Sequence, residues 1–138
     1  MTQPAFTAIR QALATRLGSI SGLRVVASRN AVVNPPSAVV MPGPGTFLRY
    51  SVTFDGQADP VLRVLLLVSE ADSASGQDNL DPYLATTGPS SVWAAVQADP
   101  TLGGVVSGAA VMEASAYGLM NWNGVDYLSC QFTVAIEI

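Results

Sequence analysis

The sequence contains no histidine and no lysine, and these two absences remove most of the usual catalytic chemistry. Histidine is the commonest general base and a frequent metal ligand near neutral pH. Lysine is needed for Schiff-base formation and for the phosphate-binding position of a P-loop. We therefore expect a protein that is not an enzyme, with no catalytic residue, no metal site and no cofactor.

Cysteine is almost absent as well, since Cys130 is the only one in the chain. A single cysteine cannot form an intrachain disulfide, which suits synthesis in a reducing cytoplasm. Cys130 has no histidine to activate it, and it falls on the apolar face of the last expected strand. Because free cysteine behaves as a small buried hydrophobe, we interpret it as a core residue rather than a nucleophile.

Charged residues make up only 12% of the chain, less than half of the usual share of about 25%. So few charges suggest that part of the surface is covered by other protein. The net charge is −4, and all basic residues are arginines. Nucleic-acid binding needs clustered positive charge, so we expect no independent duplex binding. The arginines are instead scattered singly along the chain, at Arg10, Arg16, Arg24, Arg29, Arg49 and Arg63.

The chain also lacks a long hydrophobic run. Its longest apolar stretch, Val64–Val68, is far shorter than the roughly 20 residues that span a bilayer. The N-terminal segment carries Arg10 and Arg16 and is amphipathic, unlike a signal peptide. We therefore expect no membrane association. The length of 138 residues fits one domain, 1–138, without internal repeats.

Hydrophobic periodicity in the first half predicts one helix followed by strands. Phe6, Ile9, Leu13 and Leu17 recur at helical spacing, and Gly18 suits a helix end. Strands are expected at Leu23–Ser28, Ala38–Met41 and Thr46–Phe54, the last leading into a loop that runs to Pro60. Val61–Val68 is apolar on both faces except at Arg63, which is typical of a central strand covered on both sides.

The second half predicts two short helices and a hairpin. The first helix passes through Gln77 and Leu84, with Pro82 as an obstacle that either kinks it or starts a new turn. Ser90 or Ser91 caps the second helix, with Val92, Trp93 and Val96 on its apolar side. A strand at Ala110–Tyr117 leads to a hairpin turn at Asn123-Gly124. The final strand has one core face made by Leu128, Cys130, Phe132, Val134, Ile136 and Ile138.

This order of elements predicts an α+β fold, with a single mixed, mostly antiparallel sheet and two or three helices packed on one face. Within it, Asp78 and Asp81 share a helix face and could hold a cation, but we favour a solvated surface. Gly103–Gly108 is interpreted as a connector rather than a phosphate loop. Trp122, at the hairpin tip, either folds back over the sheet or is offered to a partner.

Several segments resemble small neck and tail proteins of actinobacteriophages, and through them the tail terminators of lambda-like, long-tailed phages. The similarity covers nearly the whole chain, although no single motif is diagnostic. Its most specific part is Ser91–Val96 followed by Asp99–Val106. The other matching segments are Ile9–Leu13, Arg16-Leu17, Ile20–Val25, Asn34–Val40, Gly118, Gly124, Tyr127-Leu128 and Phe132–Val134.

The resemblance implies a structural virion protein that forms a ring, a hexamer, on the head-proximal end of the finished tail tube. Such a ring ends tube polymerisation and joins the tail to the neck. Its partners would be other copies of the chain, the tail tube protein and a neck or head-completion protein. Genome DNA would pass through the lumen without specific binding.

The expected ring contacts lie in loops and at the hairpin, where chain segments can reach beyond their own core. Acidic side chains would face the lumen and repel DNA phosphates, at Asp55, Asp59 and Asp72. Two alternatives stay open: a head-completion or stopper protein of the neck, and a small-ligand-binding α+β domain. The candidate contact residues are Met41, Pro42, Gly43, Pro44, Gly45, Gly103, Gly104 and Trp122.

Overall fold

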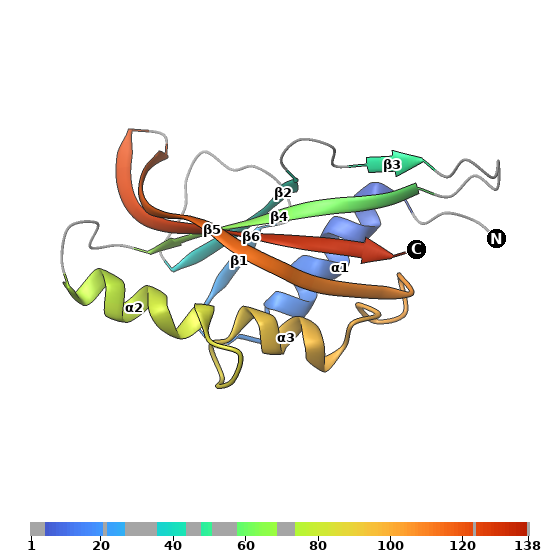
Figure 1. Ribbon diagram of the computed structural model, residues 1–138, viewed down its shortest axis with the longest axis horizontal. Helices are drawn as coiled ribbons and strands as arrows, with labels where there is room; N and C mark the ends of the chain where they lie inside the picture. Colours follow the sequence, from blue (N-terminus) through green and yellow to red (C-terminus); the bar gives the residue numbers. More distant parts are fainter. Residues whose placement is uncertain are drawn as a thin grey trace.

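The computed structural model describes residues 5–20, 22–26, 36–43, 48–50, 58–68, 74–122 and 124–137 (Figure 1). The elements follow the expected order of one helix, strands, two helices and a final hairpin. They are α1 (Phe6–Leu17), β1 (Arg24–Val26), β2 (Ser37–Pro42), β3 (Leu48–Tyr50), β4 (Ala58–Val68), α2 (Ala74–Leu84), α3 (Val92–Ala98), β5 (Gly108–Trp122) and β6 (Val125–Glu137).

The strands form one mixed sheet with the order β1-β2-β4-β6-β5. Only the β1–β2 pair is parallel, and the other pairs along this path are antiparallel. The short β3 pairs with the beginning of β4, where Leu48 lies opposite Pro60. The final strand β6 is therefore inserted between β4 and β5, and β1 and β5 lie at the two edges.

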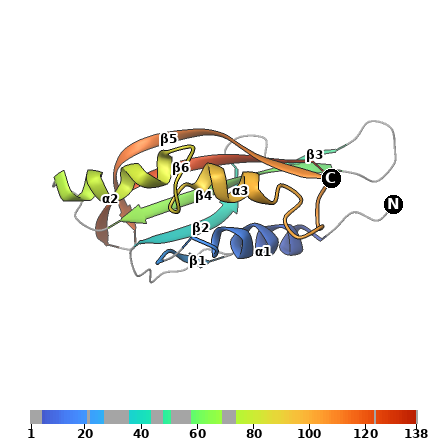
Figure 2. The ribbon, with the colours of Figure 1, turned by 90° about the horizontal axis from the view of Figure 1, so that it is seen from below.

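The three helices cover one face of this sheet, which confirms the expected α+β architecture (Figures 1 and 2). Helix α1 contacts β1 and β2, α2 contacts β4 and β6, and α3 contacts β5. Their buried side chains join the even-numbered residues of β4 and β6 in one core. Burying this apolar layer supplies most of the free energy that favours folding.

Helix α1 forms as its periodicity predicts. Ile9, Leu13 and Leu17 are fully buried against the sheet. The helix ends at Gly18, whose backbone N–H donates to the carbonyl of Ala14 at 2.9 Å. The small apolar stripe at positions 9, 13 and 17 is therefore enough to fix which face of α1 meets the core.

The two short helices resolve the points that the sequence left open. Helix α2 continues past Pro82, which lies inside its last turn. Ser91 is the N-cap of α3, and its Oγ accepts the N–H of Ala94 at 3.0 Å. The expectation that Trp93 is a core residue is wrong, because its side chain is 40% exposed. Val92 and Val96 take the buried face of α3, and Trp93 is turned about 100° away from Val92.

Strand β4 is central and covered on both faces, as its apolar pattern predicts. Leu66 packs on the helix side, while Leu65 and Leu67 pack on the other side, and all three are fully buried. The expected loop up to Pro60 is wrong, because β4 already begins at Ala58. Residues 58–60 pair with β3, and pairing with β6 starts only at Val61.

The β5–β6 hairpin turns where the Asn-Gly pair was predicted, since Trp122 pairs with Val125 and Gly124 has a φ of 88°; Asn123 itself lies outside the described residues. Strand β5 is longer than the expected Ala110–Tyr117. Its register shifts twice, between Val111 and Glu113 and between Ser115 and Gly118. Such bulges bend a strand, and the end of the hairpin curls away from the helices (Figure 1).

The curled hairpin forms a second, smaller core on the face opposite to the helices. Trp122 and Tyr127 pack there with Val39, Leu65 and Leu67. Trp122 is only 5% exposed, so of its two alternatives the structure takes the one in which it folds back over the sheet. Burial removes its ring from the surface that was expected to meet a partner.

Candidate functional site

The first group of expected contact residues lies at the end of β2. Met41 is half-buried and Pro42 is exposed, whereas Pro44 and Gly45 lie outside the described residues. Gly43 donates its N–H to the carbonyl oxygen of Val61 at 2.8 Å. A Cβ at this position would lie 2.6 Å from that same oxygen. Gly43 is therefore needed for the close approach of two backbones, whatever else this loop contacts.

The second group forms a tight turn after α3. Gly103 and Gly104 have φ values of 76° and 90°, which glycine adopts without strain. The carboxylate of Asp99 holds the turn, because it accepts the hydroxyl of Thr101 at 2.8 Å and the N–H of Gly103 at 2.9 Å. These hydrogen bonds lower the pKa of Asp99. Gly103 and Gly104 are exposed in this hydrogen-bonded turn, whereas Leu102 between Thr101 and Gly103 is buried.

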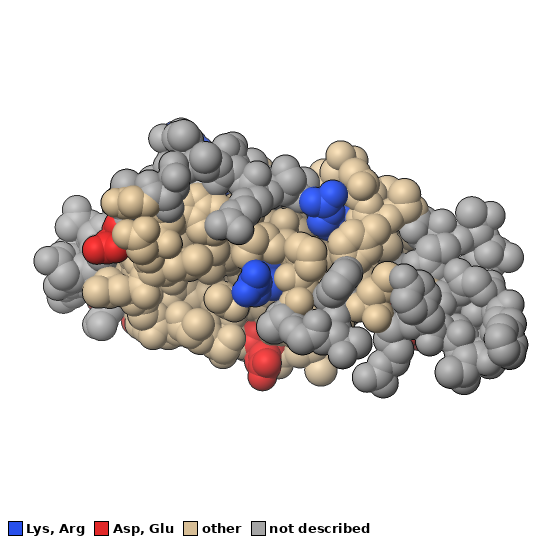
Figure 3. Space-filling view, turned by 90° about the horizontal axis from the view of Figure 1, so that it is seen from above, with Lys and Arg blue, Asp and Glu red and all other residues tan. Residues whose placement is uncertain are grey.

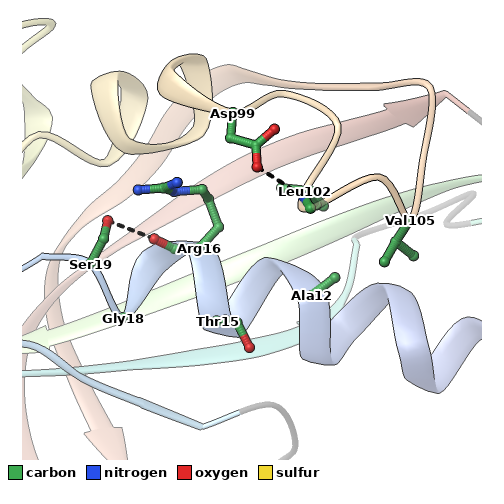
Figure 4. A pocket seen from close by; sticks show the side chains of 9 residues that line it. Ala12, Thr15, Arg16, Gly18, Ser19, Asp99, Leu102 and Val105 are labelled. Atoms are coloured by element: carbon green, nitrogen blue, oxygen red, sulfur yellow. Dashed lines mark hydrogen bonds between the residues drawn. The ribbon is translucent and has the colours of Figure 1, made fainter.

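A hollow of about 450 Å³ separates this turn from the second half of α1 (Figure 4). Arg16 and Asp99 contribute its charged groups, and Thr15 and Ser19 add hydroxyls. Ser19 donates its hydroxyl to the carbonyl of Arg16 at 2.8 Å, so that group is engaged within the helix end. The hollow thus lacks a nucleophile paired with a base, which a covalent catalyst requires.

Of the expected lumen-facing acids, Asp59 alone falls within the described ranges. It is exposed on β4 and lies opposite Arg49 of β3 in the strand register. Asp55 and Asp72 lie outside the described residues. Asp78 and Asp81 are exposed on α2, as expected for a solvated face. Within the described part of the chain, no group of three or more cysteines and acidic residues is arranged to hold a metal ion.

Cys130 is buried in the main core, in agreement with its position on the apolar face of β6. Burial raises the pKa of its thiol, which keeps the sulfur in the unreactive protonated form.

The most unusual surface of the described chain is strand β5. Of the candidate contact residues, only Trp122 belongs to this strand, at its end. Met112 and Leu119 are each 65% exposed, and Tyr117 is 42% exposed. Glu113 is the only charged residue between Gly108 and Trp122, and this stretch contains no proline. An exposed edge strand normally carries charges or proline to prevent association. In the sequence, the near absence of charge over this stretch was the signal that could have indicated this surface. Only the strand order of the sheet reveals that β5 is an edge strand.

Charged groups are few on the described part of the face opposite to the helices. Figure 3 shows single blue and red groups separated by uncharged residues on the part of this face that the structure describes. No basic patch appears among those residues. Their arrangement agrees with the scattered arginines of the sequence and offers no track for a nucleic-acid backbone.

No protein-family model matches the sequence, and no curated protein matches it either. Among the described helices, none is both long and apolar enough to cross a bilayer.

Proposed function

We propose that this chain is a structural protein of a long-tailed phage, a tail terminator. Copies of it form a ring, a hexamer, on the head-proximal end of the tail tube. The ring stops tube polymerisation and joins the tail to the neck. The resemblance of the sequence to phage neck and tail proteins supplies the location.

The observation that carries the proposal is the exposed, nearly uncharged edge of β5. Met112, Tyr117 and Leu119 keep much of their apolar surface in water in the isolated chain. Fully burying one such side chain against a neighbour is favourable by about 1.5–3 kcal/mol. A surface of this kind favours permanent contact with protein.

The hollow beside α1 gives less support to a ligand-binding domain. A small-molecule site needs polar groups that are free to converge on the ligand. Asp99 already accepts hydrogen bonds from Thr101 and Gly103 within its own turn. Its carboxylate is therefore committed to holding the turn.

The charge of the chain fits a ring through which DNA moves. At a net charge of −4, neighbouring phosphates are repelled rather than retained. Asp59, exposed at the beginning of β4, is the described residue that we assign to the lumen. Asp55 and Asp72 belong to the same proposal.

A reconstruction of the neck of an intact virion tests this function. We expect the chain as a closed ring of six copies at the head-proximal end of the tube. Purified protein added to polymerising tube protein should also cap the tubes and limit their length. A single copy in the neck, or a position away from the tube end, would overturn the terminator assignment. A ring on the head side of the neck would instead identify a head-completion protein.

A further inference from the structure

The elements on the two sides of the sheet carry charged residues of opposite sign. Helix α1 and strand β1 lie along one side of the molecule, and α2 and β5 lie along the other (Figure 2). The charged residues of α1 and β1 are all basic: Arg10, Arg16 and Arg24. The charged residues of α2, β5 and β6 are all acidic: Asp78, Asp81, Glu113, Asp126 and Glu137.

Among the described residues, neither edge strand pairs with a second strand. Within the described residues, β1 pairs only with β2, and β5 pairs only with β6. The outer backbone groups of an edge strand are available to a neighbouring chain. The acidic edge adds the exposed apolar side chains of Met112, Tyr117 and Leu119.

We propose that the β5 edge of one copy docks against the α1–β1 edge of the next copy. This inference rests on the proposed ring and names the surfaces that close it. A ring requires a heterologous contact, in which two different surfaces of each subunit meet. The chain itself carries both complementary surfaces, which is why we assign the contact to a second copy.

Electrostatics selects this arrangement over a symmetric one. Two β5 edges facing each other would bring acidic sides together, and two α1–β1 edges would bring arginines together. Like charges placed opposite each other across an interface oppose association. Since each chain also carries a net charge of −4, copies repel unless opposite edges meet.

The strand directions set the geometry of the contact. In a neighbour of the same orientation, β1 runs antiparallel to β5, because only the β1–β2 pair in the sheet is parallel. The register shifts around Met112 and Ala116 interrupt continuous backbone pairing along β5. Side-chain packing and charge therefore dominate the contact.

Arg24 is the one charged residue of β1, and Glu113 is the one charged residue of β5. Arg24 pairs with Ser37, in the same residue row as the buried Leu67. Glu113 pairs with Thr133 of β6, which pairs with Arg63 of β4. Arg63 in turn pairs with Met41 of β2, so Glu113 and Met41 lie in one row across the sheet. Both rows project on the sheet face away from the helices. Since Ser37 and Met41 are separated along β2, neighbouring copies must be staggered along their strands to bring the two charges together.

A charge-exchange experiment tests the edge pairing. Glu113→Arg reverses the charge on strand β5, and Arg24→Glu reverses the charge on strand β1. We expect each variant alone to lose self-association at least about tenfold in sedimentation velocity, and to cap tail tubes poorly. An equimolar mixture should assemble again as an alternating ring, because every contact then joins opposite charges.

Two further variants serve as controls. Thr86→Arg combined with Thr87→Arg changes the net charge by the same amount as Glu113→Arg, but in the exposed loop between α2 and α3, and should assemble like the wild type. The chain carrying both Glu113→Arg and Arg24→Glu keeps its net charge and should self-associate. Recovery in the mixture cannot come from two misfolded variants, so it reports the contact itself.

The outcomes separate the two proposals. If the wild type forms rings and both single variants assemble equally well, the edge pairing is wrong while the ring stands. If both variants fail and their mixture does not recover, the pairing is wrong as well. If the wild type forms no closed assembly, either alone or on tail tubes, the proposed function fails and the pairing fails with it.

Discussion

The hydroxyl of Tyr117 donates a hydrogen bond to the carboxylate of Asp81 at 2.8 Å, and this contact ties the edge strand β5 to α2. The pKa of Tyr117 lies above its ordinary value of 10.0. The largest cause is partial desolvation, followed by the hydrogen bond to Asp81 and the negative charge of Asp81. A group whose pKa is raised by folding stabilises the fold below its unfolded pKa. That contribution is lost as the pH rises through the folded pKa.

Tyr117→Phe should therefore lower the free energy of unfolding slightly at neutral pH. Above a pH of about 10, the stability of this variant should fall less steeply with pH than that of the wild type. Urea unfolding midpoints at neutral and alkaline pH measure both effects. Asp81→Asn keeps an acceptor oxygen but removes the charge, so its pH dependence should lie between those of wild type and Tyr117→Phe. If Tyr117→Phe declined as steeply as the wild type above neutrality, the contact would have no such role.

Leu65→Ala tests whether the face of β4 opposite to the helices is truly core. Leu65 is fully buried among Val39, Leu67 and Trp122. We expect a loss of about 2–5 kcal/mol in the free energy of unfolding. Leu119→Ala is the matched control, because Leu119 is 65% exposed and its loss should cost within about 0.5 kcal/mol. Equal effects of the two changes would show that the hairpin does not cover Leu65.

Gly43→Ala should disturb the junction of β2 and β4. The added Cβ would lie 2.6 Å from the carbonyl oxygen of Val61, which is backbone and cannot rotate away. We expect destabilisation by about 1–3 kcal/mol in chemical unfolding. Gly108→Ala, where nothing lies within 4 Å of the new Cβ, should be tolerated. A neutral Gly43→Ala would mean that the two backbones separate more easily than their hydrogen bond suggests.

Cys130→Ala should leave assembly intact. Cys130 is 1% exposed and contributes packing rather than reactivity. We expect a loss of stability of about 1–2 kcal/mol and unchanged tube capping. In the wild type, a thiol reagent should label Cys130 only after unfolding. A variant that folds normally but no longer assembles would assign the cysteine a role beyond the core.

Residue patterns predicted which side chains are buried better than they predicted how the strands and helices are arranged. The alternation in β6 and the apolar residues Val64–Val68 in β4 identified core faces, because burial acts on each residue separately. Trp93 was misassigned because a large apolar side chain signals burial only if the surrounding elements cover it, and Trp93 is turned about 100° away from the buried Val92. The length of β5 depends on bulges that no local pattern marks.

The candidate site was even less visible in the sequence. Glycine and proline loops were chosen for their freedom to reach a partner, yet Gly43 is held by the close approach of two strands. The exposed surface around Met112 and Leu119 follows from β5 being an edge. Edge position is decided by β6 inserting next to β4, a pairing between distant parts of the chain.

That insertion also governs how the protein folds. Val68 pairs with Leu128, and Val61 pairs with Ala135, so the centre of the sheet joins residues far apart in sequence. Closing such long loops costs conformational entropy before any contact repays it, and folding is correspondingly slow. Until β6 arrives, β4 has an open, strongly apolar side that can capture other chains. In a cell that expresses this protein, the yield would then depend on chaperones, and at high expression on temperature, more than on the stability of the finished fold.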